Sequence, residues 1–276
     1  MKPTVSVTVI MGVFNPPSPK RLLEAVSSIV RQTFRDWELI LYDDGSQEKY
    51  IPLLRRAARL DKRIRLFRES RNQGLAHALN ASIRLAAGEW IARMDDDDIS
   101  LPDRLEKQVA FLRSHPQYQW VGSNAQLIDR TGVWGLQSMP VRPQARDFLS
   151  HSPYIHPSVL FRKKILLENG GYRESKDYRQ CEDYELFMRL HQKGYRGYNL
   201  QEPLLQYWED LASYRKRTYS RRMREMRLRY QGFERLGLSR AATLPYVLKP
   251  LAVGAVPAPL LRFLRKRTKG GEVRTP

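Results

Sequence analysis

The spacing of apolar residues along the first half of the chain predicts strands that alternate with helices. Over residues 5–13 an apolar side chain stands at every second position, a period typical of a β-strand. Two prolines at 16 and 17 end this strand, and Ser18 or Pro19 can start a helix with apolar residues at helical spacing. The same succession then repeats. Further strands are expected at 37–42, 64–67 and 89–94, and further helices at 53–60, 75–85 and 101–114.

Turn and cap residues suggest where these elements end. The helix over 75–85 opens after Asn72 and is expected to close at Gly88. The next helix has Ser100 as its expected N-cap and Pro102 in its first turn.

From Trp120 the pattern changes. Residues 120–122 and 125–128 resemble strands and 129–132 a hairpin turn. A strand at 155–161 is expected to lead into a helix that stops at Gly170, and the last helix of this part ends at Gly194.

Strands that alternate with helices of this length predict an α/β fold with a mostly parallel, Rossmann-like sheet flanked by helices. Right-handed crossovers bring the carboxyl ends of parallel strands to one rim, where open sheets bind ligands. Phe14 and Asn15, Asp43 and Asp44, and the aspartates at 95–98 should therefore converge.

Four consecutive aspartates, residues 95–98, follow the fourth expected strand. An isolated acidic run is usually a solvated loop, because adjacent carboxylates repel one another. At a strand end, carboxylates spaced as in Asp95 and Asp97 can instead reach in the same direction. One can then bind Mg²⁺ or Mn²⁺, which prefer oxygen ligands, and the other a sugar hydroxyl. A calcium loop is excluded, because Ser100 stands where such a loop needs glycine.

The other rim residues have ordinary structural explanations as well. Asp43 and Asp44 can form a simple turn, and Phe14 can be a core residue. The segment from Asn72 to Gly74 can be only a helix cap, although helix N-termini also suit phosphate.

Seven segments together resemble the family 2 glycosyltransferases, and the resemblance covers roughly residues 4–210. In chain order they are 5–15, 27–34, 37–46, 72–76, 92–102, 155–158 and 182–186. The resemblance implies a GT-A fold, a nucleotide-sugar donor, a divalent metal and inversion at the anomeric carbon. The implied activity is sugar transfer from a UDP- or dTDP-linked donor to a glycan or lipid-linked acceptor, in cell-surface polysaccharide biosynthesis.

The resemblance also implies roles for single residues. Phe14 takes the place of an aromatic beside the nucleobase, and Asp44 that of an acid that accepts from it, supported by Asp43. Asp97 would bind the metal and Asp183 would be the general base. The implied donor-binding residues are Val13, Phe14, Asn15, Asp43, Asp44, Asn72, Gly74, Arg93, Asp95 and Asp96. Glu182 and His156 belong to the acceptor side, and Asp98 is expected to brace the following helix.

Asp183 and His156 also have ordinary structural explanations. An acid such as Asp183 at a helix start is also favoured by the helix dipole, by ~0.3–1 kcal/mol. A lone histidine such as His156 is more often structural. The sequence also departs from the family: Gly12 replaces a common proline, Phe14 a tyrosine, and residues 205–211 lack a histidine that often assists the metal.

Charge is concentrated at the C-terminal end. The chain has a net charge of +19, and residues 212–276 contain 17 Lys and Arg against 3 Asp and Glu. We therefore expect a catalytic domain at 1–211, with a donor half (1–115) and an acceptor half (116–211), and a basic helical extension at 212–276.

The basic extension suggests contact with an anionic membrane surface, since its last part is amphipathic. A solvated helical cap is the alternative, and no nucleic-acid-reading motif accompanies the charge. The single cysteine, Cys181, and the absence of ~18 consecutive apolar residues or a signal peptide suggest a cytoplasmic protein, at most peripheral to the inner face of the plasma membrane.

Two rival functions stay open at this point. A nucleotidyltransferase also uses rim aspartates and metal, but it needs a glycine-rich phosphate loop that the sequence lacks. A non-catalytic membrane- or nucleic-acid-binding protein with a Rossmann-like core is the other.

Overall fold

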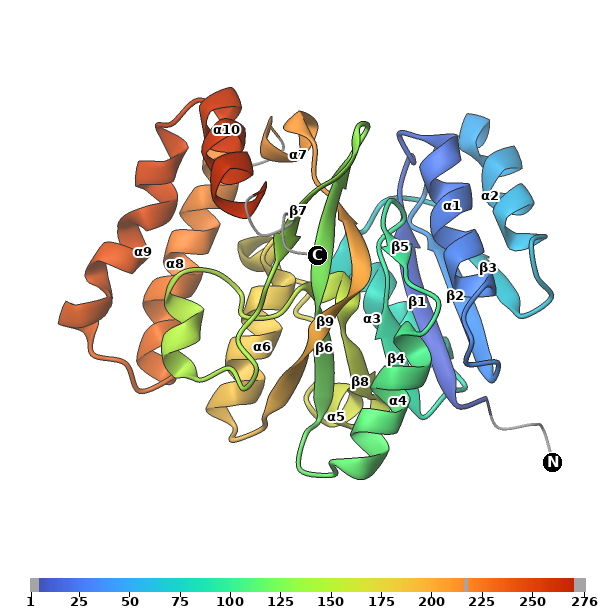
Figure 1. Cartoon of the computed structure of the whole chain (residues 1–276), viewed down its shortest axis with the longest axis horizontal. Helices are drawn as coiled ribbons and strands as arrows, with labels where there is room; N and C mark the ends of the chain where they lie inside the picture. The colour runs from blue at the N-terminus through green and yellow to red at the C-terminus, as the bar shows by residue number, and fades with distance from the viewer. Residues whose placement is uncertain (1–4, 216–217, 271–276) are drawn as a thin grey trace.

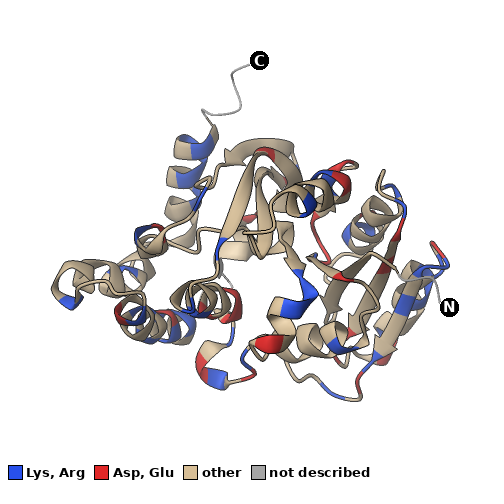
Figure 2. Ribbon diagram, turned by 90° about the horizontal axis from the view of Figure 1, so that it is seen from below, with Lys and Arg blue, Asp and Glu red and all other residues tan. Residues whose placement is uncertain are grey.

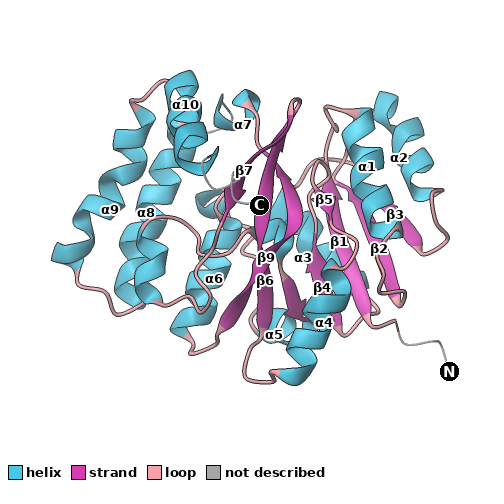
Figure 3. Ribbon diagram, viewed as in Figure 1, coloured by secondary structure: helices cyan, strands magenta, loops and turns pink. Residues whose placement is uncertain are grey.

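The computed structural model describes residues 5–215 and 218–270, and it confirms the α/β fold class. A mixed sheet runs through the molecule in the order β3-β2-β1-β4-β8-β6-β9-β5, with β7 added to β6 (Figures 1 and 3). Helices cover both of its faces. The strands are β1 (Val7–Val13), β2 (Trp37–Asp43), β3 (Ile64–Arg68), β4 (Trp90–Arg93), β5 (Ile99–Ser100), β6 (Trp120–Asp129), β7 (Gly132–Gln137), β8 (Leu160–Arg162) and β9 (Gly197–Trp208).

Ten α-helices and four short 3₁₀ helices occur in the described residues. The α-helices are α1 (Pro19–Val30), α2 (Ile51–Ala58), α3 (Leu75–Leu85), α4 (Arg104–Ser114), α5 (Lys163–Glu168), α6 (Glu182–Gln192), α7 (Leu211–Arg215), α8 (Tyr219–Arg235), α9 (Arg240–Gly254) and α10 (Ala258–Lys269). The 3₁₀ helices are η1 (Glu48–Tyr50), η2 (Ala145–Leu149), η3 (His156–Ser158) and η4 (Lys176–Tyr178).

The N-terminal half of the sheet is parallel, as expected. β1 pairs with β2 and with β4, and β2 pairs with β3, all in parallel register. Val13 lies opposite Asp43, so the loops that follow these two strands begin side by side. The predicted convergence at one rim follows directly from this register.

Both faces of this parallel half are buried, which explains its nearly continuous apolar strands. Val9 belongs to a cluster with Leu22 of α1 and Leu105 of α4. Its neighbour Ile10 points to the other face and belongs to a cluster with Leu79 of α3 and Phe187 of α6. The period of two along β1 thus places successive side chains in different layers.

The second half of the sheet is mixed. β8 is antiparallel to β4 and β6, whereas β6 is parallel to β9. β6 and β7 form the predicted hairpin, with Gly132 at a φ of 106° in its turn. β9 also carries β5 at its edge, which places the end of the aspartate run against β9.

Two predicted helix boundaries are wrong. Ser100 is not an N-cap but part of β5, where it lies opposite Leu205, and α4 begins only at Arg104. Helix α3 ends at Leu85, and Gly88 does not cap it. Gly88 instead donates its N–H to Thr8 Oγ1, and a Cβ there would lie 2.6 Å from the Thr8 nitrogen. In both cases pairing with a distant strand decided the local conformation.

The C-terminal helices pack on the rest of the chain. A Cβ on Gly232 of α8 would lie 2.4 Å from the sulfur of Met188 on α6, so the two helices approach closely. Arg262 and Lys266 of α10 both pair with Asp129. Burial opposes ionisation of the Asp129 carboxyl, but Lys266 and the hydrogen bonds from Thr131 keep its pKa below the ordinary value. Lys216, Arg217 and residues 271–276 of the predicted extension lie outside the described residues.

Candidate active site

A cavity of about 1080 Å³ lies at the rim where the parallel strands end. Its wall contains side chains from three parts of the chain that are far apart in sequence. Among them are Phe14, Asp44 and Asp95 from the strand ends and Asp183 from the start of α6. These four residues therefore share one space, whereas the two aspartates that follow Asp95 are not among the residues that line it.

Asp44 is held by the loop that leads into α3. Its Oδ1 accepts a hydrogen bond from the backbone N–H of Gln73 at 2.8 Å. Its Oδ2 accepts from the N–H of Gly74 and from Asn72 Nδ2, both at 2.8 Å. Gly74 has a φ of 101°, which a residue with a side chain rarely adopts. These contacts set the Asp44 carboxylate firmly at the cavity wall.

Asp43 and Asn15 support the loops beneath the cavity. Buried Asp43 accepts from the N–H of Ser46 at 2.8 Å and pairs with Arg68 at 3.2 Å. Asn15 accepts from the N–H of Gln47 at 2.9 Å. Neither residue is among those that line the cavity.

Phe14 is not a core residue, because 48% of its surface is exposed. It follows Val13, which also lines the cavity, and Asp44 stands in the same wall. An aromatic face exposed beside a fixed carboxylate is suited to a planar ring with an N–H donor.

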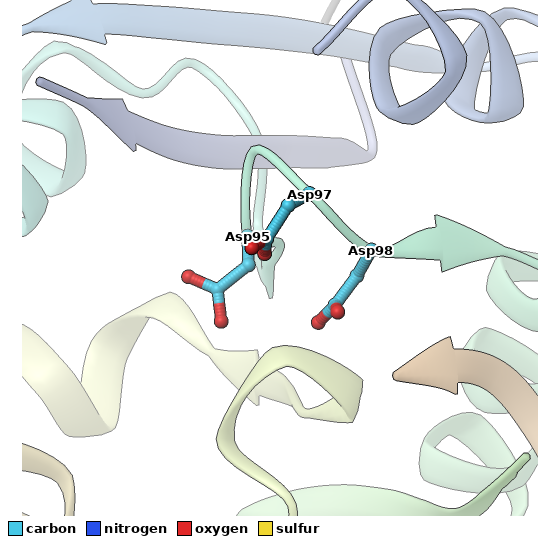
Figure 4. Close-up of side chains that lie close together, drawn as sticks. All are labelled: Asp95, Asp97 and Asp98. Atoms are coloured by element: carbon cyan, nitrogen blue, oxygen red, sulfur yellow. The ribbon is translucent and has the colours of Figure 1, made fainter. Parts of the chain in front are cut away.

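The aspartates after β4 lie close together on one short loop (Figure 4). Single oxygen atoms of Asp95, Asp97 and Asp98 lie within 4.8 Å of one another. Asp95 forms an ion pair with buried Arg93 at 2.5 Å, and Asp97 has Arg21 at 3.6 Å. Asp96 is not part of this group. Its pKa is raised to about 7, chiefly because the protein shields it from water and also because of the charges of Asp97 and Asp95.

Asp98, which was expected to brace the next helix, contacts strand β9. It is 1% exposed, and its Oδ1 accepts from the N–H of Trp208 on β9 at 2.8 Å. Its Oδ2 has no hydrogen-bond partner among the described residues. Burial, with added repulsion from Asp95 and Asp97, raises the pKa of the Asp98 carboxyl well above its ordinary value. The side chain thus lies beside the aspartate group, and its charge also acts on Arg104 at the start of α4.

The aspartate group fits a hard divalent cation. It offers three carboxylates, and one buried oxygen, Asp98 Oδ2, lacks a partner in the described chain. Such oxygen-only donors suit Mg²⁺ and Mn²⁺. The group contains no histidine, in keeping with the lack of one in residues 205–211.

Glu182 and Asp183 form the first turn of α6, and both line the cavity. Asp183 is partly exposed there, and burial is the main reason why its pKa lies above the ordinary value of 3.8. Glu182 is buried, and its Oε2 has no partner among the described residues. Its pKa is raised to about 7, again chiefly by burial. A carboxylate with a raised pKa is a better proton acceptor.

His156 lines the cavity but does not lie on a strand, because the expected strand at 155–161 is largely a 3₁₀ turn, η3, and only Leu160–Arg162 pair. Its Nε2 lies 2.7 Å from the hydroxyl of Tyr172. Burial, together with the nearby charge of Arg93, keeps its pKa well below the ordinary value, so the ring is neutral. A neutral ring held in this way supports the wall between Arg93 and α6.

Sequence reasoning missed the contribution of the C-terminal helices to this cavity. Arg221 and Arg229 of α8, Lys249 of α9 and Arg265 of α10 all line it. Glu209, just after β9, also lines it and pairs with Arg265 at 2.6 Å. The amphipathic pattern of the extension predicted membrane contact or a helical cap, and it carried no signal that these helices line the cavity.

Comparison with known proteins agrees with this geometry. The sequence model of glycosyl transferase family 2 matches residues 8–170. The chain belongs to this family. The Bacillus subtilis (strain 168) protein EpsE, which is named as a glycosyltransferase, is 37% identical over 263 residues, which are 95% of this chain and 94% of EpsE.

Solved structures show the same fold. A structure of Staphylococcus aureus TarS with UDP-GlcNAc has a TM-score of 0.68 and 18% identity, over 89% of this chain and 71% of that one. The mannosyltransferase PcManGT from Pyrobaculum calidifontis, with GDP-Man and Mn²⁺, has a TM-score of 0.62 and 20% identity, over 95% and 79%. The protein is thus a glycosyltransferase with a GT-A fold and a helical C-terminal region.

Proposed function

We propose that this glycosyltransferase transfers a sugar from a UDP- or dTDP-linked donor to a hydroxyl of a glycan or lipid-linked acceptor, with inversion, in cell-surface polysaccharide biosynthesis. The observation that carries the proposal is the single cavity that contains Asp44, Asp95 and Asp183. This arrangement supports the proposal, because one space of this size could hold a donor near Asp44 and Asp95 and an acceptor near Asp183. The domain division at residue 211 remains part of this proposal.

The donor would bind along the strand ends. The nucleobase would stack on the exposed ring of Phe14, and Asp44 would accept from its ring N–H. Although both oxygens of Asp44 already accept hydrogen bonds, a carboxylate has lone pairs for further donors. Asp95 and Asp96 would lie near the ribose and diphosphate, and Asp97, with Asp95 and Asp98, would hold Mg²⁺ or Mn²⁺.

Asp183 would take the proton of the acceptor hydroxyl as that oxygen attacks the anomeric carbon. The bond to the nucleoside diphosphate breaks on the opposite face, so the configuration inverts. The bound metal would neutralise part of the charge on the departing diphosphate. Glu182 and His156 would shape the acceptor side of the cavity from behind Asp183.

A screen of nucleotide sugars tests this proposal. The full chain is incubated with UDP-, dTDP- and GDP-linked sugars and Mn²⁺, and release of the free nucleoside diphosphate is measured. We expect release from at least one UDP- or dTDP-linked donor, and loss of release when EDTA is added. Release from none of them would contradict the proposal, and formation of inorganic pyrophosphate would indicate nucleotidyl transfer instead.

We also propose that the C-terminal helices contact an anionic membrane surface at the inner face of the plasma membrane. Leu260 and Phe263 of α10 are 47% and 61% exposed, and Leu248 of α9 is 46% exposed. Arg267, further along α10, is exposed as well. No helix within residues 5–215 or 218–270 is long and apolar enough to span a membrane alone, although the bent pair α9–α10 meets that criterion when taken together.

Membrane contact predicts co-sedimentation with vesicles that contain phosphatidylglycerol. The double substitution Leu260→Ser, Phe263→Ser should lower the bound fraction at least fivefold, because it removes two exposed apolar side chains without touching the cavity lining. Exposed Leu167 on α5, far in sequence from the extension, gives the control Leu167→Ser, which should bind as wild type. Equal binding by all three proteins would remove the membrane proposal.

A further inference from the structure

The C-terminal helices form a positively charged wall of the catalytic cavity. The charged residues that line this wall are six cations and one acid: Arg221, Arg222, Arg229, Lys249, Arg265, Lys269 and Glu225. At the strand ends the charged lining residues are Asp44, Arg93 and Asp95. Helices α8–α10 and strands β1–β3 lie on opposite sides of the molecule (Figure 1), and Figure 2 shows basic residues along the C-terminal helices. The two substrates would therefore meet walls of different charge.

Some of these cations serve the fold. Arg229 is 2% exposed and donates to the carbonyls of Leu149, Ser150 and Tyr246, so it ties α8 to the loop after η2 and to α9. Arg265 is paired with Glu209. These two side chains have little capacity left for a ligand.

Lys249 and Arg221 are different. Lys249 is exposed in the cavity wall, and its ammonium donates a hydrogen bond of 3.3 Å to the Ser150 carbonyl, which leaves N–H donors for other acceptors. Arg221 forms no side-chain hydrogen bond or ion pair with residues 5–215 or 218–270, although its charge acts on Glu182 and Asp183. Arg221 can therefore turn toward a ligand beside Asp183, and Lys249 toward a ligand beside His151.

His151, on the loop after η2, reports the local potential. It lines the cavity, and its pKa is lowered to about 4, first by its partial removal from water and then by the charges of Lys249, Arg265, Arg229 and Lys269. The four cations make the potential at His151 positive, although Arg229 is paired with Glu225 and Arg265 with Glu209.

The same wall is partly apolar. Pro250 and Val253 of α9 and Leu261 and Leu264 of α10 line the cavity beside the cations. A wall of this composition can bind an anionic group alone, and it can also bind an anionic group that carries an apolar chain.

We propose that the acceptor carries a phosphate or diphosphate group, which Lys249 and Arg221 bind beside His151 while the attacked hydroxyl reaches Asp183. The inference rests on the proposed function and names the acceptor class of the same cavity. Phosphate suits these residues because an arginine fork and a lysine ammonium form strong charge-assisted hydrogen bonds to its oxygens. The phosphate group can belong to a lipid-linked sugar or to a phosphate-bearing glycan without a lipid.

Binding of inorganic pyrophosphate to the full chain, with EDTA present to remove metal, tests the anion site. We expect the NMR pKa of the His151 ring to rise by at least one unit when pyrophosphate binds. The double variant Arg221→Gln, Lys249→Gln should bind it at least tenfold more weakly. The control Arg227→Gln, Arg267→Gln removes two exposed cations of the same extension from outside the cavity lining, and it should change the affinity less than twofold. An equal loss of pyrophosphate affinity in both double variants would overturn the proposal. A pKa of the His151 ring that does not change when pyrophosphate is added would overturn it as well.

Farnesyl diphosphate distinguishes the two sources of the phosphate group. A lipid-linked acceptor predicts that farnesyl diphosphate binds at least tenfold more tightly than pyrophosphate, and that Leu261→Ser removes this difference. Equal affinities for farnesyl diphosphate and pyrophosphate would indicate an acceptor whose phosphate group is not attached to a lipid. The proposed anion site would then still stand.

Release of nucleoside diphosphate by the wild-type protein separates this inference from the proposed function. If no nucleotide sugar is hydrolysed or transferred, the proposed function fails whatever pyrophosphate does. If a donor is used but pyrophosphate binding does not depend on Arg221 and Lys249, only the anionic acceptor is refuted.

Discussion

Substituting Asp183 by asparagine should lower the rate of sugar transfer by roughly 10²–10⁴-fold, the usual contribution of a positioned general base. Asparagine keeps the shape of the side chain but cannot accept the proton. Donor binding should stay within about threefold of wild type, because Asp183 is proposed to contact the acceptor hydroxyl and not the nucleotide. Transfer rate is measured with the donor found in the screen, and donor affinity by calorimetry.

The rate of sugar transfer should depend on pH in a definite direction. Burial raises the pKa of Asp183 above 3.8, and the base must be ionised to work. The wild-type rate should therefore fall, as pH is lowered, at a pH above that expected for an ordinary aspartate.

The unfolding temperature of the Asp183→Asn variant shows whether a loss of activity comes from a loss of folding. A raised folded-state pKa means that the folded protein binds the proton more tightly than the unfolded chain, so stability falls as pH rises from the unfolded pKa to the folded one. Above that window Asp183→Asn should unfold at the same temperature as wild type or higher. Asp177→Asn, an exposed acid of η4, should leave both rate and stability unchanged. Full activity of Asp183→Asn would refute its role as base.

Substituting Asp97 or Asp98 by asparagine should weaken Mn²⁺ binding at least tenfold and lower the transfer rate by at least 10²-fold. Each change removes one charged oxygen ligand from a group of three. In the Asp98→Asn variant the amide oxygen can still accept the hydrogen bond from the N–H of Trp208, so the loop should keep its place on β9. Mn²⁺ binding is measured by electron paramagnetic resonance, separately from activity.

Two further observations test the metal site. Because burial and neighbouring acids raise the pKa of Asp98, and a ligand must be deprotonated, Mn²⁺ affinity should fall as pH is lowered through a range above that of an ordinary aspartate. Asp103→Asn, next to the run but paired with Lys107 on the surface, should bind Mn²⁺ as wild type. Wild-type Mn²⁺ affinity in both Asp97→Asn and Asp98→Asn would exclude the site.

Much of the first half of the fold could be predicted, because its elements are set by local pattern. The period of two along β1 and the helical spacing after Ser18 are properties of short segments, and parallel pairing then brings Val13 and Asp43 together. The errors occurred where a distant strand competes with a local signal. Ser100 has the chemistry of a cap, yet pairing with Leu205 places it in β5.

The candidate site was predictable to a similar degree. Asp44 and Asp183 stand in motifs, so their presence could be found in the sequence, and both line the cavity. The position of Asp98 could not be predicted from the sequence. It depends on a hydrogen bond from Trp208 on β9, 110 positions later in the chain, and on the closeness of Asp98 to Asp95 and Asp97.

The sequence by itself determined the family, the parallel N-terminal half and the acids proposed to carry the chemistry, because each is encoded in a short run of residues. The tertiary structure alone decided which aspartates share a candidate cation site and which wall the basic extension forms. Those outcomes depend on contacts between residues far apart in the sequence, such as Arg265 with Glu209 and Arg262 with Asp129. Charge in a sequence shows that a cation is present, and only packing decides which face of the cavity receives it.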